Sequence, residues 1–349
     1  MALKAMYEVP LSARVRKPAL LHRLGLNDSG LEARLREGMD AAEQQLLAQT
    51  GSPPDARLAG LTGHLAVAGG KRLRPLLVLL GAEFGDPARP GVIRAAVVTE
   101  LVHVSSLYHD DVMDDATSRH GVPSVNARWG ARLAVLAGDL LLAKAARLAA
   151  ELGEEAVALN AEVAGELVAG QLCELAGPGP GEDAIGHYFR VIAGKTAALI
   201  AVSLRIGAQQ AGAPAPVVRA LGEYGRELGL AFQMADDLLD LRAPSEQLGK
   251  EQGRDLAAGV ASLPVLLALA DHSPRGTALR ELLAAGPAAS PAEQRRALKL
   301  FRRSPAPAQA EAMMRERLDR ARAPLADLPA VPALRALNAL CDFVADQTG

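Results

Sequence analysis

Apolar residues recur along most of the chain at spacings of three and four, which is the period of a helix buried on one side. Clusters of Gly and Pro separate the repeating segments and are typical of helix ends. The pattern predicts helices over these ranges: Ser29 to about Gln49, about Ala56 to Ala68, a helix with Pro75 in its first turn, Val92 through Tyr108 into the acidic stretch that follows, about 131–152, 154–175 and 182–209, a helix opened by Pro214 and Pro216, and four further segments ending near Ala345.

The same pattern predicts the fold class. No segment alternates apolar and polar residues as a half-buried strand would, and we find no hairpin signal. We therefore expect an all-α protein that forms a single large helical bundle. One domain is expected over residues 1–349, with residues 1–28 as an irregular extension. The segment Ala116–Ser124 is expected to be a polar loop.

Composition narrows the class of protein. Half of the 349 residues are hydrophobic and only 3% are aromatic, so the core consists mainly of Leu, Ala and Val, which favours helices. The formal net charge is -2, and no basic run is interleaved with aromatic residues. We therefore expect no nucleic-acid partner.

Cysteine usage and hydropathy bear on the compartment. Cys173 and Cys341 lie far apart without metal-ligand spacing, which fits a reducing compartment without a disulfide framework. The N-terminus shows no apolar signal-peptide core, and the apolar stretch near 197–208 is interrupted by Arg205. We therefore expect a cytoplasmic protein without a transmembrane segment.

Two acidic motifs of the same form are the strongest chemical signal. The first acidic motif is Asp110-Asp111-x-x-Asp114, and the second is Asp236-Asp237-x-x-Asp240. On a helix, the first and last carboxylates of each motif lie one turn apart on the same face, where like charges repel. Divalent cations would turn this repulsion into attraction, and carboxylate oxygens in this number suit Mg²⁺. A solvated acidic face is the alternative for either motif alone.

Facing each other across a cavity, the two motifs could bind a diphosphate through metal ions and make it a good leaving group. Such a step needs no nucleophilic side chain, and no Ser-His-Asp or Cys-His arrangement stands out. Basic residues beside glycines could complete the site, namely Lys71, Arg74, Arg119, Lys195 and Lys250. An ordinary surface cation is the alternative for each of these residues taken singly.

On these motifs the chain resembles the trans-isoprenyl diphosphate synthases of the polyprenyl synthetase family. The matching elements occur in the family's order over about residues 60–270. They are Gly69-Gly70-Lys71-Arg72-Leu73-Arg74-Pro75, the first acidic motif with Arg119 and Gly121, Gly138-Asp139, Gly194-Lys195-Thr196, Phe232-Gln233 with the second acidic motif, and Gly249-Lys250 with Gly253 and Asp255-Leu256.

The resemblance implies an all-α isoprenoid-synthase fold with a central cavity, Mg²⁺ as cofactor, and head-to-tail condensation of isopentenyl diphosphate onto an allylic diphosphate. It implies metal ligands at Asp110, Asp111, Asp114, Asp236, Asp237 and Asp240. It implies contacts to the allylic substrate from Arg119, Lys195, Thr196, Gln233 and Lys250. It implies contacts to isopentenyl diphosphate from Lys71, Arg74 and His103. The residues expected to act in catalysis are Asp110, Asp111, Asp114, Lys195 and Asp236.

Two positions depart from the family pattern. The usual Arg-Arg after the first acidic motif is Arg119-His120 here, and the usual Thr-Leu-Pro is Ser262-Leu263-Pro264. His120 carries a positive charge only part of the time near neutral pH, so weaker binding of isopentenyl diphosphate is expected there. The departure leaves open a subunit that needs a partner. The family resemblance otherwise implies a homodimer.

Small residues upstream of the first acidic motif bear on product length. In the family, a large side chain four or five positions before the motif resembles a floor that stops chain growth. Those positions are Ser106 and Ser105 here, so we expect a long product, of about C30 or more. Simple helix packing is the alternative role for both serines, and a geranylgeranyl or farnesyl diphosphate synthase is the alternative function.

Three other classes of protein share some of these features. Glu100-Leu101-Val102-His103 has the Glu-x-x-His spacing of di-iron helical bundles, but such a site needs two copies and only one is found. A non-catalytic subunit would usually have lost the acidic motifs. A class I terpene cyclase would not need the loop with Lys71 and Arg74, which suits a second diphosphate.

Overall fold

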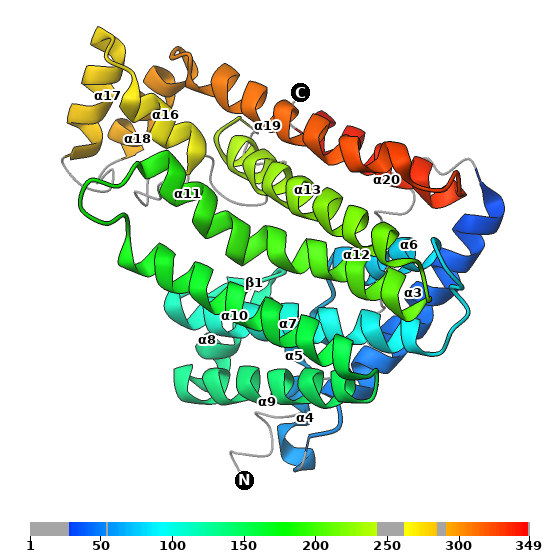
Figure 1. Ribbon diagram of the computed structural model, residues 1–349. Coiled ribbons are helices and arrows are strands. Elements are labelled where there is room, and N and C mark those ends of the chain that lie inside the picture. Colours follow the sequence, from blue (N-terminus) through cyan, green and yellow to red (C-terminus); the bar gives the residue numbers. More distant parts are fainter. Residues whose placement is uncertain (1–27, 54, 243–261, 285–290, 348–349) are drawn as a thin grey trace. The chain divides into compact units, whose positions relative to one another are not determined.

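The computed structural model describes residues 28–53, 55–242, 262–284 and 291–347 (Figure 1). Within these ranges the secondary structure is helical apart from one two-stranded hairpin, which confirms the all-α prediction. The described residues group into two compact units. The first comprises residues up to Leu167, Leu199–Gly222 and Asp327–Ala339, and the second comprises Val168–Ala198, Glu223–Ala326 and the residues from Leu340 onward.

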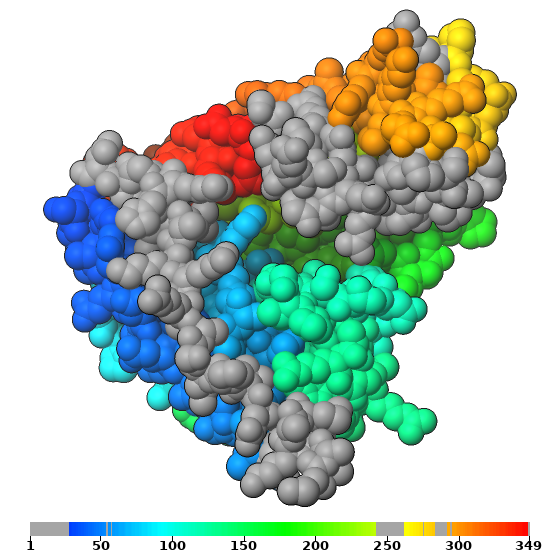
Figure 2. All heavy atoms as spheres, turned by 180° about the vertical axis from the view of Figure 1, so that it is seen from behind, coloured from blue at the N-terminus to red at the C-terminus, as the bar shows by residue number. Residues whose placement is uncertain are grey.

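The first unit is built around helix α7 (Gly91–Met113), which packs against α3 (Ser29–Thr50), α6 (Leu73–Ala82) and α9 (Ala131–Ala150). Buried residues occur on all sides of α7, as expected of a central helix. The outer side of α3 is exposed and appears in blue in Figure 2. The smaller elements are η1 (Ala56–Leu58), α4 (Ala59–Thr62), α5 (His64–Ala68), β1 (Ser118–Arg119), β2 (Val122–Pro123) and α8 (Val125–Trp129).

Helices α7 and α9 approach closely because small residues lie between them. The Ser105 hydroxyl donates a hydrogen bond of 2.8 Å to the carbonyl of Gly138 on α9. A Cβ placed on Gly138 would lie only 2.4 Å from Nε2 of His109, so a larger residue there would require the His109 ring to move. Ser105 therefore has a packing role, and its side chain points toward α9.

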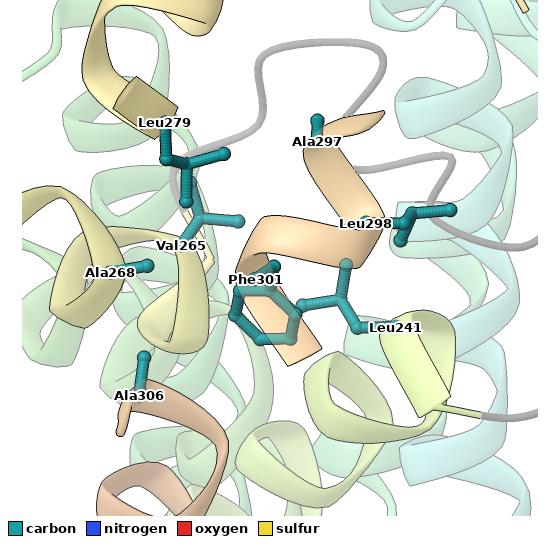
Figure 3. Close-up of a cluster of buried hydrophobic side chains, with 8 residues drawn as sticks. All are labelled: Leu241, Val265, Ala268, Leu279, Ala297, Leu298, Phe301 and Ala306. Carbon is teal, nitrogen blue, oxygen red and sulfur yellow. The ribbon is translucent and has the colours of Figure 1, made fainter. Parts of the chain in front are cut away.

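The second unit has its own apolar core, formed by residues from α13 (Ala215–Arg242), α16 (Leu263–Ala270), α17 (Pro274–Ala284), α18 (Pro291–Arg302) and α19 (Ala306–Arg322). Phe301 is fully buried in this core beside Leu241, Val265 and Leu279 (Figure 3). The remaining elements of the chain are α10 (Glu154–Ala176), α11 (Ala184–Ile192), the π-helical turn η2 (Ala193–Ala197), α12 (Ala198–Gln210), η3 (Ala323–Asp327) and α20 (Pro332–Asp346).

The helices predicted at 131–152 and 154–175 are confirmed to within two residues by α9 and α10. The segment predicted as one helix from Ala56 to Ala68 is instead divided at Gly63 into short pieces. The C-terminal part holds five α-helices in the described residues, one more than predicted.

The expectation of a polar loop at Ala116–Ser124 was wrong in one respect, because this segment contains the hairpin β1–β2. Arg119 pairs with Val122, and the two residues between them, His120 and Gly121, both have positive φ angles, 53° and 78°. Two successive left-handed residues form the turn that matches the twist of paired strands. His-Gly was the sequence signal that could have revealed it, since His is enriched in this conformation.

One stretch of the described chain, Ala184–Gln210, is long and apolar enough to cross a membrane by length and composition alone. Its most apolar window is 78% buried within the fold, as in the core helix of a globular protein.

Candidate active site

The first acidic motif lies at the C-terminal end of α7. The helix ends at Met113, Asp114 is its capping residue, and the last turn holds no basic side chain. The C-terminus of a helix carries partial negative charge, so carboxylates there are destabilised unless a cation is near. The sequence places this motif on a helix, and the structure adds that it occupies the helix end least favourable to its charge.

Asp111 has the most constrained carboxylate of this motif. Its side chain is fully buried, and its Oδ1 accepts from Nε of Arg119 at 2.8 Å and pairs with Nη2 at 2.6 Å. Its Oδ2 is buried and has no hydrogen-bond partner. Burial raises the pKa of Asp111, and the guanidinium of Arg119 acts in the opposite direction.

The hairpin that carries Arg119 is held at several points. The Asn126 amide donates to the carbonyls of Asp111 and Ala116, at 3.0 and 3.1 Å. Nε2 of His64 lies 2.7 Å from the carbonyl of Pro123, and the His64 ring packs edge-on against Trp129. These contacts fix the hairpin beside the end of α7.

Three of the residues predicted to bind diphosphates gather around His103, which was predicted to bind one as well. Nη1 of Arg74 lies 3.4 Å from Nε2 of His103. Burial lowers the pKa of His103 well below its usual value, and the charges of Arg74, His120 and Arg119 add to this effect. His103 is therefore neutral at neutral pH and lies among cationic groups.

His120 lies close to these residues and contacts the glycine turn that precedes α6. Its ring makes a hydrogen bond to the backbone of Gly69, and its Cε1 is 3.6 Å from where a Cβ on Gly70 would lie. Burial and the neighbouring charges of Arg119 and Arg72 lower the pKa of His120. Lys71 is exposed on the same turn.

Arg72 is a residue that the sequence analysis did not assign to the site. It makes buried ion pairs with Glu43 and Glu100, at 2.7 and 3.0 Å. The pairing of Glu100 with Arg72 corrects the di-iron alternative, because Glu100 was the carboxylate that such a site would need. No sequence signal links Arg72 to Glu43, which lies 29 residues away.

In the second unit, Asp237 of the second acidic motif is the centre of a hydrogen-bond network. Its Oδ2 accepts from the Tyr188 hydroxyl at 2.8 Å and from the backbone N–H of Leu263 at 3.3 Å. Its Oδ1 accepts from Gln233 at 3.0 Å, and Gln233 in turn accepts from the Thr196 hydroxyl at 2.9 Å. The structure thus brings three predicted residues together, and adds Tyr188.

The other carboxylates of this motif differ in exposure. Asp236 is exposed, whereas the side chain of Asp240 is 1% exposed. Both lie within the last two turns of α13, which ends at Arg242. As on α7, the carboxylates therefore cluster near a helix C-terminus.

Lys195 lies in the π-helical turn η2, a widened turn that is common at functional sites. Its amino group pairs with Glu174 of α10, a partner that the sequence analysis missed. Gly170 permits this approach, since a Cβ there would lie 2.8 Å from the backbone nitrogen of Lys195. Lys250 lies outside the described residues.

The residues present fit a divalent cation. Among the described residues, no three His, Cys, Asp or Glu side chains are placed to hold an ion by themselves. Mg²⁺, however, commonly uses only one or two carboxylates and completes its shell with water and substrate phosphates. The buried Oδ2 of Asp111, which has no hydrogen-bond partner, and the all-carboxylate donor sets at two helix C-termini match this chemistry.

Comparison with known proteins assigns the chain to a family. The family model for polyprenyl synthetase matches residues 55–301. The nonaprenyl diphosphate synthase of Mycobacterium tuberculosis is 41% identical over 96% of this chain and 100% of its own length. Component 2 of the heptaprenyl diphosphate synthase of Geobacillus stearothermophilus is 38% identical over 80% of this chain and 87% of its own.

Solved structures agree with this assignment. The geranylgeranyl pyrophosphate synthase of Corynebacterium glutamicum, solved with calcium and isoprenyl diphosphate, has a TM-score of 0.85 and 40% identity, covering 93% of this chain and 99% of that one. The decaprenyl diphosphate synthase of Rhodobacter capsulatus has a TM-score of 0.83 and 31% identity, covering 91% and 98%. The chain therefore belongs to the polyprenyl synthetase family and is a prenyl diphosphate synthase, a transferase, as its motifs predicted.

Proposed function

We propose that this enzyme condenses isopentenyl diphosphate head-to-tail with an allylic diphosphate, using Mg²⁺, to give a trans-polyprenyl diphosphate of about C30 or longer. The observation that carries the proposal is the gathering of two arginines, Arg74 and Arg119, and the His120 ring around His103, in the same unit as the carboxylates that end α7. An anion site beside a metal-binding end of a helix suits two diphosphate substrates.

In this proposal, Asp110, Asp111 and Asp114 would hold Mg²⁺ on the allylic diphosphate, and so would Asp236, Asp237 and Asp240. When bound, the metal neutralises the diphosphate charge and makes the diphosphate a better leaving group. A single domain over 1–349 with a central cavity is part of this proposal.

The remaining residues bind and orient the substrates. Arg119, Lys195, Gln233 and Lys250 contact the allylic diphosphate, and Thr196 orients Gln233 through their hydrogen bond. Lys71, Arg74, His103 and His120 bind isopentenyl diphosphate. Because His103 is neutral, it contributes one donor to the diphosphate, while Arg74 beside it contributes charge.

The chemistry then takes place on the substrates. The C–O bond of the allylic diphosphate breaks, and the double bond of isopentenyl diphosphate forms the new C–C bond with the allylic carbon. A proton leaves the condensed product for the departing diphosphate. The chain's groups hold both diphosphates in place, so that the two carbons are close when the bond forms.

Product length is proposed to depend on Ser106 rather than Ser105. Ser106 precedes Asp110 by one helical turn on the same face, and its side chain is half-buried. Ser105 is committed to the contact with Gly138. The long product is supported by relatives named as nonaprenyl and octaprenyl diphosphate synthases, whereas others are named as geranylgeranyl diphosphate synthases.

We propose a cytoplasmic homodimer. The exposed apolar side chains include four on α10, namely Val157, Val168, Leu172 and Leu175, with 43%, 58%, 62% and 62% of their surface exposed. A Cβ on Gly165 of the same helix would meet nothing within 4 Å. An apolar helix face of this kind suits a second copy of the chain. A separate partner subunit is the alternative, supported by the name of the two-component heptaprenyl relative.

The test is to incubate the purified protein with labelled isopentenyl diphosphate, several allylic primers and Mg²⁺, and to size the products by chromatography. We expect chains of about C30 or longer, and no product when EDTA replaces Mg²⁺. Ser106→Phe should shorten the product, whereas the matched Ser105→Ala should leave its length unchanged. Absence of product with every primer, from a protein shown to be folded, would contradict the proposal.

A further inference from the structure

Arg72 is the one cationic residue of the Lys71–Arg74 segment that the proposed mechanism does not use. Its side chain is 7% exposed, whereas Lys71 is exposed and Arg74 is half-buried. The backbone explains this difference, because Arg72 has a φ of 50°, in the left-handed region that residues other than Gly rarely adopt. The chain is turned so that Arg72 points inward between two residues that bind diphosphate.

The guanidinium of Arg72 holds this segment to three separate helices. Its Nε and Nη2 contact the two carboxylate oxygens of Glu43 on α3, at 2.7 and 2.9 Å. Its Nη1 contacts Oε1 of Glu100 on α7 at 3.0 Å. Its Nη2 also donates to the carbonyl of Ala66 on α5 at 2.6 Å. Each of its three nitrogens is therefore engaged in a fixed geometry.

These contacts set the register of the segment along α7. Glu100 and His103 are three residues apart and lie on the same side of the helix. Arg72 pairs with Glu100, and Arg74 lies 3.4 Å from His103. The two arginines thus contact residues that lie about one helical turn apart on α7. A shift of Arg72 away from Glu100 would move Arg74 away from His103.

Charge and burial make the arrangement sensitive to substitution. Burial acts against the charge of Arg72, but Glu43 and Glu100 outweigh it and raise the pKa of the guanidinium. Lys in its place would supply one point charge instead of a planar fork. A partly broken buried network leaves charges unpaired, and the segment would then lose its single position.

We propose that Arg72, held by Glu43 and Glu100, is the positioning residue of the isopentenyl diphosphate site, and that it fixes the backbone from which Lys71 and Arg74 reach the substrate. This inference rests on the proposed function, because it takes Lys71 and Arg74 as diphosphate ligands. Arg72 itself touches no substrate and acts through its neighbours.

The chain offers a matched control at the other end of α6. Arg34 of α3 makes a two-pronged ion pair with Glu83, which caps the C-terminus of α6, with contacts of 2.9 and 2.5 Å. This pair joins the same two helices, α3 and α6, as Arg72 and Glu43 do. If Arg72 has a purely structural role, breaking either ion pair should change the affinity for isopentenyl diphosphate to the same extent.

The experiment measures binding without turnover. Isopentenyl diphosphate is titrated calorimetrically into the full-length protein in EDTA, for the wild type, Glu43→Gln, Arg72→Lys and the control Glu83→Gln. We expect Kd to rise about tenfold in the first two variants, since outer partners of a binding group typically contribute that much. Glu83→Gln should bind as the wild type does. In turnover assays, KM for isopentenyl diphosphate should rise while KM for the allylic substrate stays constant.

The possible results distinguish the positioning role of Arg72 from the proposed enzymatic function. Wild-type affinity in a folded Glu43→Gln protein, or equal weakening in Glu83→Gln, overturns the positioning role while wild-type turnover leaves the proposed function standing. If Arg72→Lys does not fold, the milder Glu43→Gln decides. A wild type that neither binds isopentenyl diphosphate nor makes product overturns the proposed function and this inference together.

Discussion

The two acidic motifs have the same form but different surroundings. In the first, Asp111 meets a charged partner, Arg119, and keeps one buried oxygen that has no hydrogen-bond partner. In the second, both oxygens of Asp237 accept from neutral donors on three helices: the Tyr188 hydroxyl, the Gln233 amide and the backbone N–H of Leu263. The same residue type at the same motif position thus pairs with a guanidinium in one unit and accepts from a hydroxyl, a side-chain amide and a backbone N–H in the other.

A repeated motif therefore does not assign equal roles to equal positions. A carboxylate with an oxygen left over can accept a further ligand, such as a cation. A carboxylate engaged by three donors already joins α11, α13 and the start of α16. We therefore expect the middle positions of the two motifs to respond differently to the same substitution, and the outer positions to respond alike.

The largest effect is expected at the outer positions. Asp110→Ala and Asp236→Ala should each lower kcat by about a thousandfold, or about 4 kcal/mol, because each removes one of the proposed metal ligands. Steady-state kinetics across a Mg²⁺ titration measures this loss. Asp115→Asn is the matched control, since Asp115 is an exposed neighbour with a φ of 47° that Asn tolerates. An equal loss of kcat in Asp115→Asn would contradict a specific role for the carboxylates of the two motifs.

A smaller effect should distinguish the middle positions. Asp237→Asn should lower the free energy of unfolding of the metal-free protein by about 2 kcal/mol. The NH₂ group of the new Asn side chain would replace an accepting oxygen and would face a group that is itself a donor. Asp111→Asn should cost less, since burial already penalises the charge and raises the pKa of Asp111. Urea unfolding in EDTA measures both values. Tyr188→Phe, which removes one donor to Asp237, should fall between them, and equal losses for both Asn variants would contradict the contrast.

The smallest effect is expected at His120, which lies near the first acidic motif. His120→Arg should lower KM for isopentenyl diphosphate about threefold to tenfold, because a permanent charge replaces a ring that is neutral at neutral pH. Burial and Arg119 lower the pKa of His120, so the wild-type ring gains its proton only below its usual range near 6.5. Acidification to about pH 5.5 should therefore narrow the difference in KM between wild type and variant. A difference that stays constant with pH would show that His120 does not titrate at the site.

Periodicity predicted most of the helices, because most of them bury one apolar side and lie between Gly or Pro residues. It could not predict the π-helical turn at Lys195, since one extra residue in a helix leaves no distinct pattern. The hairpin at Arg119 was missed because its strands are only two residues long, too short for alternation to be visible.

The candidate site was predictable where charge is repeated in the sequence and unpredictable where it depends on distant partners. The acidic motifs and the Gly69–Arg74 loop could be found from local spacing. The pairing of Arg72 with Glu43, and of Tyr188 with Asp237, joins residues 29 and 49 positions apart. Each of these pairs comes within hydrogen-bonding distance only when its own unit is folded.

The widened turn of η2 has a consequence for how this enzyme tolerates insertions and deletions. Removal of one residue from Ala193–Ala197 would restore regular helical winding, at little cost to the backbone itself. Because one helical residue corresponds to a rotation of about 100°, the deletion would also turn the Tyr188 side chain away from Asp237. The extra residue of the π-helical turn therefore sets the direction in which Tyr188 points, so a single-residue deletion there is expected to break the contact with Asp237.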